Sequence, residues 1–205
     1  MSRPRAFEMD EALARALEVF WSRGYQAASM TELLTAMGLS KSSFYAAFGS
    51  KRDVFLAALD RYSQSYLEEV RDRFGCDGDG LRLLRDYLGE VVLGPGDAAN
   101  RRRGCMMVNV AVQLAPDDRA IEAEVRRHVA ALRAFLSAMI RRAQAQGTVS
   151  PVPAPETLAR QLLAVIVGVT VLKKGGMATD DLLAIIEAAV ATLAVGYGGA
   201  STTSA

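Results

Sequence analysis

Residues that build covalent cross-links or metal sites are scarce in this 205-residue chain. Cys76 and Cys105 are its only cysteines, and His128 is its only histidine. Two cysteines cannot form a disulfide framework, which favours a reducing compartment. One histidine and two thiols distant in sequence also lack the ligand spacing of a zinc site. We therefore expect a protein without a metal or a cofactor.

Catalytic sequence patterns are missing as well. No serine lies in G-x-S-x-G, and no G-x-G-x-x-G follows a strand-like segment. The acidic stretch GCDGDG, residues 75–80, begins like a calcium-binding loop. Leu81 stands at the fifth position of that loop, however, and no glutamate closes it, so a flexible linker is the better interpretation. We expect no enzymatic activity.

The chain has neither a large net charge nor a long apolar run. Its net charge of +1 indicates nothing about partners. The amino-terminal segment MSRPRAFEMDEALARAL carries charges throughout, and so lacks the apolar centre of a signal peptide. The longest apolar run, residues 162–172, is shorter than the roughly 18 residues that a membrane span needs. We expect a soluble cytoplasmic protein that does not associate with membranes.

Helical periodicity is what the chain does contain, and strand-like alternation is nearly absent. A first apolar stripe stops at Gly24, a residue type common at helix ends. Ser29 and Glu32 have the spacing of a capping box, which marks the start of a second helix. Gly38 ends that helix, and Ser40 can cap a short third one. The amino-terminal region therefore predicts three helices in quick succession.

The rest of the chain also predicts helices. A long one, of about 24 residues, is expected from residue 51 to residue 74. Asp117 or Asp118 is expected to cap another long helix that reaches about residue 146. Further helical segments are expected over residues 81–93, 104–115, 156–174 and 179–195. The sequence therefore predicts an all-α protein of about nine helices.

Residues 29–48 have the pattern of a helix-turn-helix, whose second helix enters the major groove of DNA with its amino end first. The backbone N–H groups at that end, together with Ser42 and Ser43, can donate hydrogen bonds to phosphates. Tyr45 can reach a further phosphate oxygen with its hydroxyl group. Ala46 leaves room for close approach, and its methyl group can meet that of a thymine. These residue types suit DNA binding.

Cations accompany the same stretch. Lys41, Lys51 and Arg52 lie between residues 38 and 52, where no acidic residue occurs. Residues 1–55 are nevertheless not basic overall, because they hold seven Lys or Arg residues and six Asp or Glu residues. Serines at helix starts are also good caps in any protein. These residues alone leave two alternatives open, a DNA-binding domain and a helical protein–protein adaptor whose helix-turn-helix is structural.

The stretch FWSRGYQAASMTELLTAMGLSKSSFYAAFGSKRDVF resembles the amino-terminal DNA-binding domain of the TetR family of bacterial transcriptional regulators, over about residues 10–56. The shared marks are the G-Y before the second helix, the hydroxyl cap, the G-L-S turn, the aromatic pair F-Y, the later phenylalanine and the S-K start of the fourth helix. Further along, RRRGCMMVN is similar to a segment found in one large branch of the family.

Carried over position by position, the resemblance implies DNA contacts by Ser29, Lys41, Ser43, Tyr45 and Lys51. The chain departs from the family at two places. Many relatives have glycine where this chain has Ser42, and a histidine and an aromatic residue where it has Ala46 and Ala47. Because fewer hydrogen-bonding side chains face the bases, readout is expected to rest partly on DNA shape. Arg3 and Arg5 form either a minor-groove arm or an ordinary solvated terminus.

The resemblance also implies how the chain is divided. A helix-turn-helix DNA-binding domain is expected over residues 1–55, a ligand-binding and dimerisation domain over residues 56–200, and a disordered tail over residues 201–205, with the long fourth helix joining the two domains. The implied assembly is a homodimer built from the last two helices and bound to a pseudo-palindromic double-stranded DNA operator.

The last two helical segments independently favour such a dimer. Their sequences, LARQLLAVIVGVTVL and DLLAIIEAAVATLAV, are apolar beyond the stripe that one core requires. Small residues such as Ala164 and Gly168 would allow close helix approach. Two helices central to their own subunit would show the same composition, so both alternatives remain open.

A small-molecule effector of unknown identity is expected to bind in the second domain. Such pockets are lined by soft apolar residues with a few polar anchors. The candidates, each of which plain core packing would also explain, are Tyr62, Tyr66, Tyr87, Cys105, Met106, Asn109, Gln113, His128, Phe135 and Met139. Asn109 and Gln113 stand out because they are polar, four residues apart and part of an apolar segment, where buried side chains need partners.

Cys105 has a second interpretation. It follows three arginines and a glycine, and cations near a thiol favour the reactive thiolate. Lys173 or Lys174, at the end of a later helix, can add to that effect. The thiol would then sense oxidants or electrophiles, whereas a buried and inert cysteine is the alternative. Together these features predict a regulator, expected to be a repressor, that an effector or a thiol modification releases from DNA.

Overall fold

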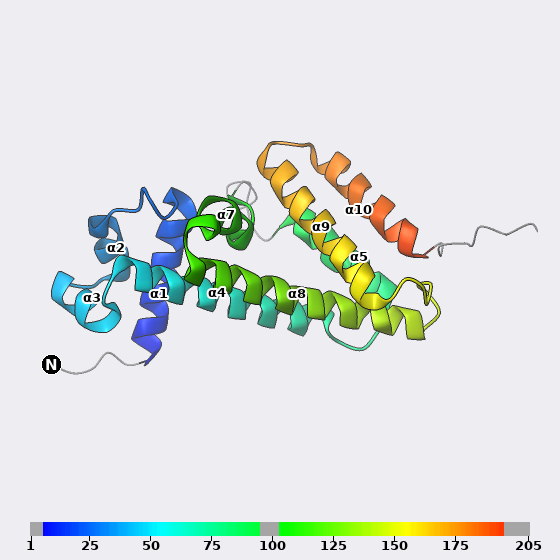
Figure 1. Cartoon of the computed structure of the whole chain (residues 1–205), viewed down its shortest axis with the longest axis horizontal. Helices are drawn as coiled ribbons and strands as arrows, with labels where there is room; N and C mark the ends of the chain where they lie inside the picture. Colours follow the sequence, from blue (N-terminus) through cyan, green and yellow to red (C-terminus); the bar gives the residue numbers. More distant parts are fainter. Residues whose placement is uncertain (1–5, 95–102, 195–205) are drawn as a thin grey trace, which may run out of the picture. The chain divides into compact units, whose positions relative to one another are not determined.

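The computed structural model describes residues 6–94 and 103–194 (Figure 1). These residues form nine α-helices and one short 3₁₀ helix, and no strand occurs among them. The predicted all-α fold is therefore confirmed. The Arg3 and Arg5 arm and the tail at residues 201–205 lie outside the described residues.

Residue contacts divide the chain into two compact units, here called unit 1 and unit 2. Unit 1 comprises Met1–Leu67 and Asn109–His128, and unit 2 comprises Glu68–Val108 and Val129–Ala205. The boundary falls inside two long helices, α4 (Lys51–Phe74) and α8 (Arg119–Ala145). Unit 1 thus takes in residues that the expected division at residue 55 assigned to the second domain, because the start of α8 packs with the start of α4. The expected division stays a prediction.

Unit 1 contains the helix-turn-helix. Its helices are α1 (Ala6–Arg23), α2 (Met30–Met37), α3 (Lys41–Phe48), the first part of α4, most of α7 (Met106–Gln113), the 3₁₀ helix Ala115–Asp117 and the beginning of α8. The predicted end of α1 and the predicted boundaries of α2, α3 and α4 are confirmed within one or two residues, since short-range caps set most of them.

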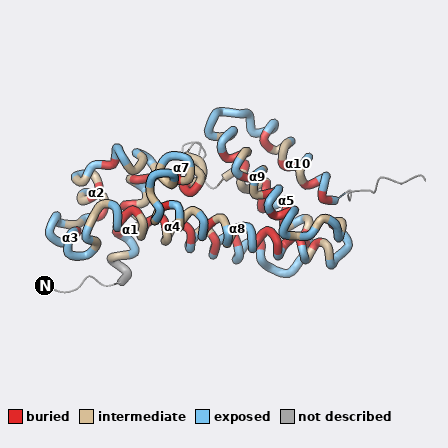
Figure 2. The backbone as a smooth tube through the Cα atoms, viewed as in Figure 1, coloured by how far each residue is buried: buried red, intermediate tan, exposed pale blue. Residues whose placement is uncertain are grey.

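Aromatic side chains fill the core of unit 1. Phe20 of α1 and Phe55 of α4 are each no more than 1% exposed, and their rings meet edge to face with centroids 5.0 Å apart. Tyr25 packs on Phe55 at 4.7 Å. Phe44 is the buried residue of α3, and Leu33 of α2 is buried as well. This core attaches each helix of the helix-turn-helix to its neighbours, and Figure 2 shows the buried residues on the inward faces.

Unit 2 is built around α5 (Gly80–Leu93), α9 (Pro155–Lys174) and α10 (Thr179–Ala194), which pack on one another. Gly80 lies so close to α8 that a Cβ atom there would come within 2.8 Å of the Ala143 backbone nitrogen. The amide of Gln146 holds the same loop, accepting from the Gly80 N–H and donating to the Gly78 carbonyl, both at 2.8 Å.

The acidic linker before α5 has a structural explanation. The Asp79 carboxylate caps α5 by accepting from the N–H groups of Leu81 and Arg82, at 3.0 and 3.1 Å. Asp77 lies 3.6 Å from the Arg142 guanidinium of α8. The two acidic side chains that suggested a calcium loop therefore have structural roles: Asp79 caps a helix, and Asp77 pairs with an arginine.

Helix α9 is the one described helix that is long and apolar enough to cross a membrane by length and composition. One third of its apolar window is buried inside the protein, and it packs against α5 and α10. Core helices of soluble proteins pass the same test, so this finding is weak evidence for a span.

Candidate nucleic-acid interface

Helix α3 buries one side chain and exposes most of the others. Gly38, with φ 67°, ends α2 and turns the chain, and Ser40 then caps α3 by accepting from the Ser43 N–H at 3.1 Å. Phe44 is fully buried and anchors the helix. Six of the eight residues are exposed, namely Lys41, Ser42, Ser43, Tyr45, Ala46 and Ala47. The structure thus brings five of the predicted contact residues onto one short exposed helix.

Three serine hydroxyl groups meet at the start of α3. The Ser40 hydroxyl lies 3.0 Å from that of Ser42 and 2.9 Å from that of Ser43. Each hydroxyl can rotate and exchange this internal bond for a phosphate oxygen. Tyr45 is 45% exposed while its ring stands edge-on to Phe44, so its side chain is accessible from outside and still packs on the core. The amino end of α3 therefore presents several donors next to free helix N–H groups.

The three expected cations have different surroundings. Lys41 is exposed at the first position of α3. The Lys51 ammonium lies over the Tyr25 ring, 4.8 Å from its centroid, which holds it beside the start of α4. Arg52 was expected to join them, but its guanidinium is bound by Asp118 at the start of α8. The sequence could not show this, because 66 residues separate the two partners.

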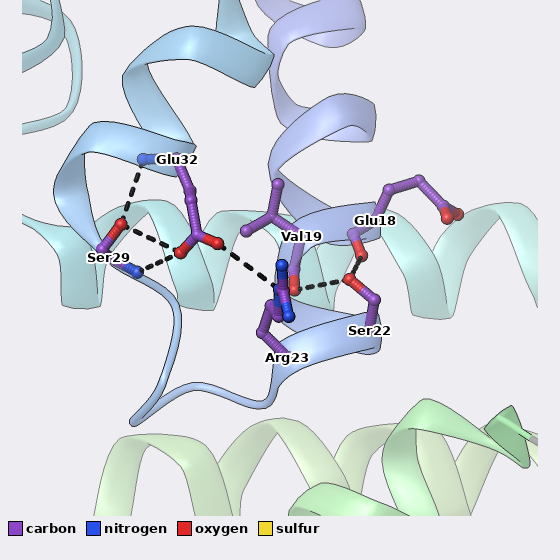
Figure 3. A network of polar contacts seen from close by, with 6 residues as sticks. All are labelled: Glu18, Val19, Ser22, Arg23, Ser29 and Glu32. Carbon is purple, nitrogen blue, oxygen red and sulfur yellow. Dashed lines mark hydrogen bonds and ion pairs between the residues drawn. The ribbon is translucent and has the colours of Figure 1, made fainter.

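Ser29 is occupied by its own helix cap (Figure 3). Its hydroxyl accepts from the Glu32 N–H at 3.1 Å and donates to the Glu32 carboxylate at 2.9 Å. The backbone N–H of Ser29 donates to that carboxylate too, and this bond above all lowers the pKa of Glu32. Arg23 of α1 lies 3.4 Å from the other carboxylate oxygen. A phosphate contact by the Ser29 hydroxyl would therefore replace its bond to Glu32.

The expected effector residues divide between the two units. Unit 1 holds Tyr62, Tyr66, Asn109, Gln113 and His128. Gln113 is exposed, so the expectation that it needs a buried partner is wrong for that residue. His128 is only 3% exposed, and Ser63 lies 2.9 Å from its Nδ1. The rings of Tyr62 and Tyr66 lie 6.2 and 5.6 Å from the imidazole.

Unit 2 holds the other candidates, which are mostly core. Met106, Met139, Tyr87 and Phe135 are all buried, and the Tyr87 ring lies edge-on to Phe135 with centroids 5.6 Å apart. Cys105 is half-buried. Among the described residues, no group of three or more histidine, cysteine or acidic side chains could hold a metal ion.

Family models and known proteins match both the amino-terminal and the carboxy-terminal part of the chain. A family model described as bacterial regulatory proteins of the tetR family matches residues 12–58, and one described as a tetracyclin repressor-like C-terminal domain matches residues 80–192. The HTH-type transcriptional repressor ComR of Escherichia coli K12 is 28% identical over 184 residues, which cover 89% of this chain and 87% of ComR. The HTH-type transcriptional activator FasR of Mycolicibacterium smegmatis is 37% identical over 82 residues, 40% of this chain and 37% of FasR.

A solved structure extends the similarity to a DNA complex. It contains a cysteine mutant of the TetR family transcriptional regulator CifR complexed with 26bp double-strand operator DNA. The superposition has a TM-score of 0.78 with 32% sequence identity, and covers 93% of this chain and 99% of that one.

The single histidine predicts a pH-dependent stability. Burial lowers the pKa of His128 from its usual 6.5 to about 4. The unfolded chain therefore binds a proton that the folded chain does not, so acidification favours unfolding below pH 6.5. We expect the free energy of unfolding to fall by about 2 kcal/mol between pH 7.5 and pH 5, measured by urea denaturation. His128→Gln should remove this dependence of the free energy of unfolding on pH. A variant that keeps it would show that His128 is not the group responsible.

Proposed function

We propose that this chain, which belongs to the TetR family of bacterial regulatory proteins, represses transcription. It would do so as a homodimer on a pseudo-palindromic operator. As a member of this family it is a transcriptional regulator that binds operator DNA, so the adaptor alternative is set aside. The repressor that matches 89% of the chain supports repression more than the activator that matches 40% of it. We propose that it acts in the cytoplasm, where bacterial operator DNA lies.

The observation that carries the proposal is the exposed face of α3. A helix that buries Phe44 and presents three hydroxyl groups, a lysine and two alanines has donors for phosphates and a low profile for close approach to bases. We assign phosphate contacts to Lys41, Ser42, Ser43 and Tyr45, and groove contact to Ala46. Ser29 and Lys51 are assigned to phosphates at the two flanks of the helix-turn-helix.

Lysine contacts with phosphates predict a defined salt dependence. Lys51→Gln should weaken operator binding and reduce the slope of log K against log salt concentration by about 1.8, because the homodimer carries two copies of Lys51 and each phosphate contact contributes about 0.9. Lys41→Gln should do the same. Lys174→Gln makes the same chemical change at the end of α9 and should leave both quantities unchanged. Fluorescence anisotropy over a salt series measures both, and an unchanged slope in Lys51→Gln would remove Lys51 from the interface.

The dimer is proposed from the exposed side of α9 and α10, which lie side by side in unit 2 (Figure 1). Val167, Val171 and Leu172 of α9 are 39, 51 and 39% exposed, and their spacing puts them on one helix face. Gly168 lies between them and adds no side chain. A Cβ atom at this position would meet nothing within 4 Å, so the surface there is open. An apolar stripe with a flat centre suits a second copy of the same helices.

The proposed dimer face predicts a matched pair of variants. Val171→Asp should convert the dimer to a monomer and weaken operator binding by about a hundredfold, because two symmetry-related charges would be buried. Val112→Asp, on the 73% exposed Val112 of α7, should leave the dimer intact. Analytical ultracentrifugation decides the matter, and a Val171→Asp protein that remains dimeric would contradict the proposal.

Release from DNA is proposed to begin in unit 2, by a small-molecule effector or by modification of Cys105. Gly104 next to it lies against α9, since a Cβ atom there would be 3.8 Å from Lys174 Cδ and 3.8 Å from Thr170 Cγ2. The Lys174 side chain is therefore close to the segment that carries the thiol.

The proposed signal would travel along α4, which is continuous from Lys51, next to α3, to Phe74. An effector can shift the protein between two states only by binding one of them more tightly. A state in which the two recognition helices no longer match the half-sites would release the operator.

The thiol proposal has a matched control in the exposed Cys76. Treatment with N-ethylmaleimide should release operator DNA from the wild type and from Cys76→Ser, but not from Cys105→Ser. An electrophoretic mobility shift assay measures release. Full release from Cys105→Ser would exclude the thiol as sensor and leave a non-covalent effector as the trigger.

A further inference from the structure

The junction between α3 and α4 is short and tightly capped. After Gly49 ends α3, Ser50 caps α4 by accepting from the Asp53 N–H at 3.1 Å and donating to the Asp53 carboxylate at 2.5 Å. Arg52 follows within the first turn of α4. Its side chain therefore sits only four positions beyond the end of the helix that meets DNA.

Arg52 makes a two-point contact with Asp118. Its Nε and Nη2 atoms donate to the two carboxylate oxygens, each at 2.8 Å. Paired parallel bonds of this kind restrict both distance and orientation, which a single point charge cannot do. The first turn of α4 is thus held at a defined angle to the residue that begins α8.

Asp118 cannot turn away from Arg52 without loss elsewhere. Its Oδ1 atom also accepts from the N–H groups of Ala120 and Ile121, at 2.9 and 3.2 Å, and so caps α8. The bonds from Arg52, together with those from Ile121 and Ala120, lower the pKa of Asp118 to about 2. The carboxylate is therefore ionised in any buffer used for DNA binding, and its side chain is 23% exposed.

We propose that Arg52 and Asp118 are positioning residues for operator recognition, which hold the α3–α4 junction on the start of α8 and thereby orient α3. Arg52 does not bind phosphate in this account, because two of its five N–H donors hold the guanidinium on Asp118. The inference rests on the proposed role of α3 as the DNA-reading helix.

The direction in which one substitution changes the affinity for DNA distinguishes a positioning role from a simple electrostatic effect. Asp118→Ser keeps a good helix cap but removes the ion pair and one negative charge. Loss of a negative charge, or release of Arg52 to a phosphate, would make DNA binding tighter. Positioning predicts the opposite, a roughly fivefold weaker binding, which is the effect of losing a good, half-exposed ion pair.

Arg52→Gln should weaken binding by a similar factor and leave the salt slope unchanged, since no phosphate contact is lost. The double variant should bind like either single variant, because the same pair is broken in each. Arg126→Gln is the control: it removes an equal charge from unit 1, but Arg126 pairs with Glu122 within α8 itself. This control should bind like the wild type.

The probe is the palindromic fragment that the wild type enriches from random double-stranded DNA. Binding of this fragment by the wild type tests the proposed function. The ratio of the variant's affinity to that of the wild type tests the role of the ion pair. Hydrogen exchange without DNA gives a second readout: residues 51–56 should exchange faster in Asp118→Ser than in the wild type. Equal or tighter binding by Asp118→Ser, a reduced salt slope in Arg52→Gln, or unchanged exchange at residues 51–56 would each overturn the inference.

Discussion

An eight-residue helix is not stable alone in water, and the DNA-reading role proposed for α3 depends on how this helix is held in place. Ser40 at its start and Gly49 at its end each satisfy one of the backbone groups that the helix leaves open, and Phe44 ties it to the core. Because one buried side chain suffices for attachment, most of the other residues of α3 are exposed, as the proposed DNA contact requires. Because a single buried side chain attaches α3 to the core, the orientation of α3 also depends on the position of the first turn of α4.

Charge is distributed sparingly around this helix. Arg23 and Arg52 each have an acidic partner in unit 1, which leaves Lys41 exposed and Lys51 stacked on a tyrosine. If the described residues supply the proposed DNA interface, two lysines give it little non-specific attraction to phosphates. Specific binding must then come from shape, from backbone and hydroxyl donors, and from two subunits bound to one operator. The proposed apolar face on α9 and α10 would supply that second subunit.

Local interactions explain why much of this arrangement could be predicted from the sequence. The capping box of Ser29 and Glu32, the helix ends at Gly24 and Gly38, and the cap at Ser40 all join residues within a few positions of one another. The family resemblance then supplied the role of α3, which periodicity alone left open between DNA binding and packing.

Contacts between distant positions could not be predicted in the same way. Asp118 was expected as a helix cap, but its second task of holding Arg52 spans 66 residues, and the pairing of Ser63 with His128 spans 65. Gln113 was expected to be buried because its neighbours are apolar, yet its own side chain faces outward. Periodicity in an eight-residue helix is too short to fix which side faces the core.

Selection of bound fragments from random double-stranded DNA, by the wild type and by Tyr45→Ala, tests the central claim most directly. The account predicts that the wild type enriches a palindrome with half-sites about one helical turn apart, or a multiple of that distance, and that Tyr45→Ala loses this enrichment while remaining a folded dimer. Equal enrichment of the same palindrome by Tyr45→Ala would contradict the claim that the exposed face of α3 reads the operator.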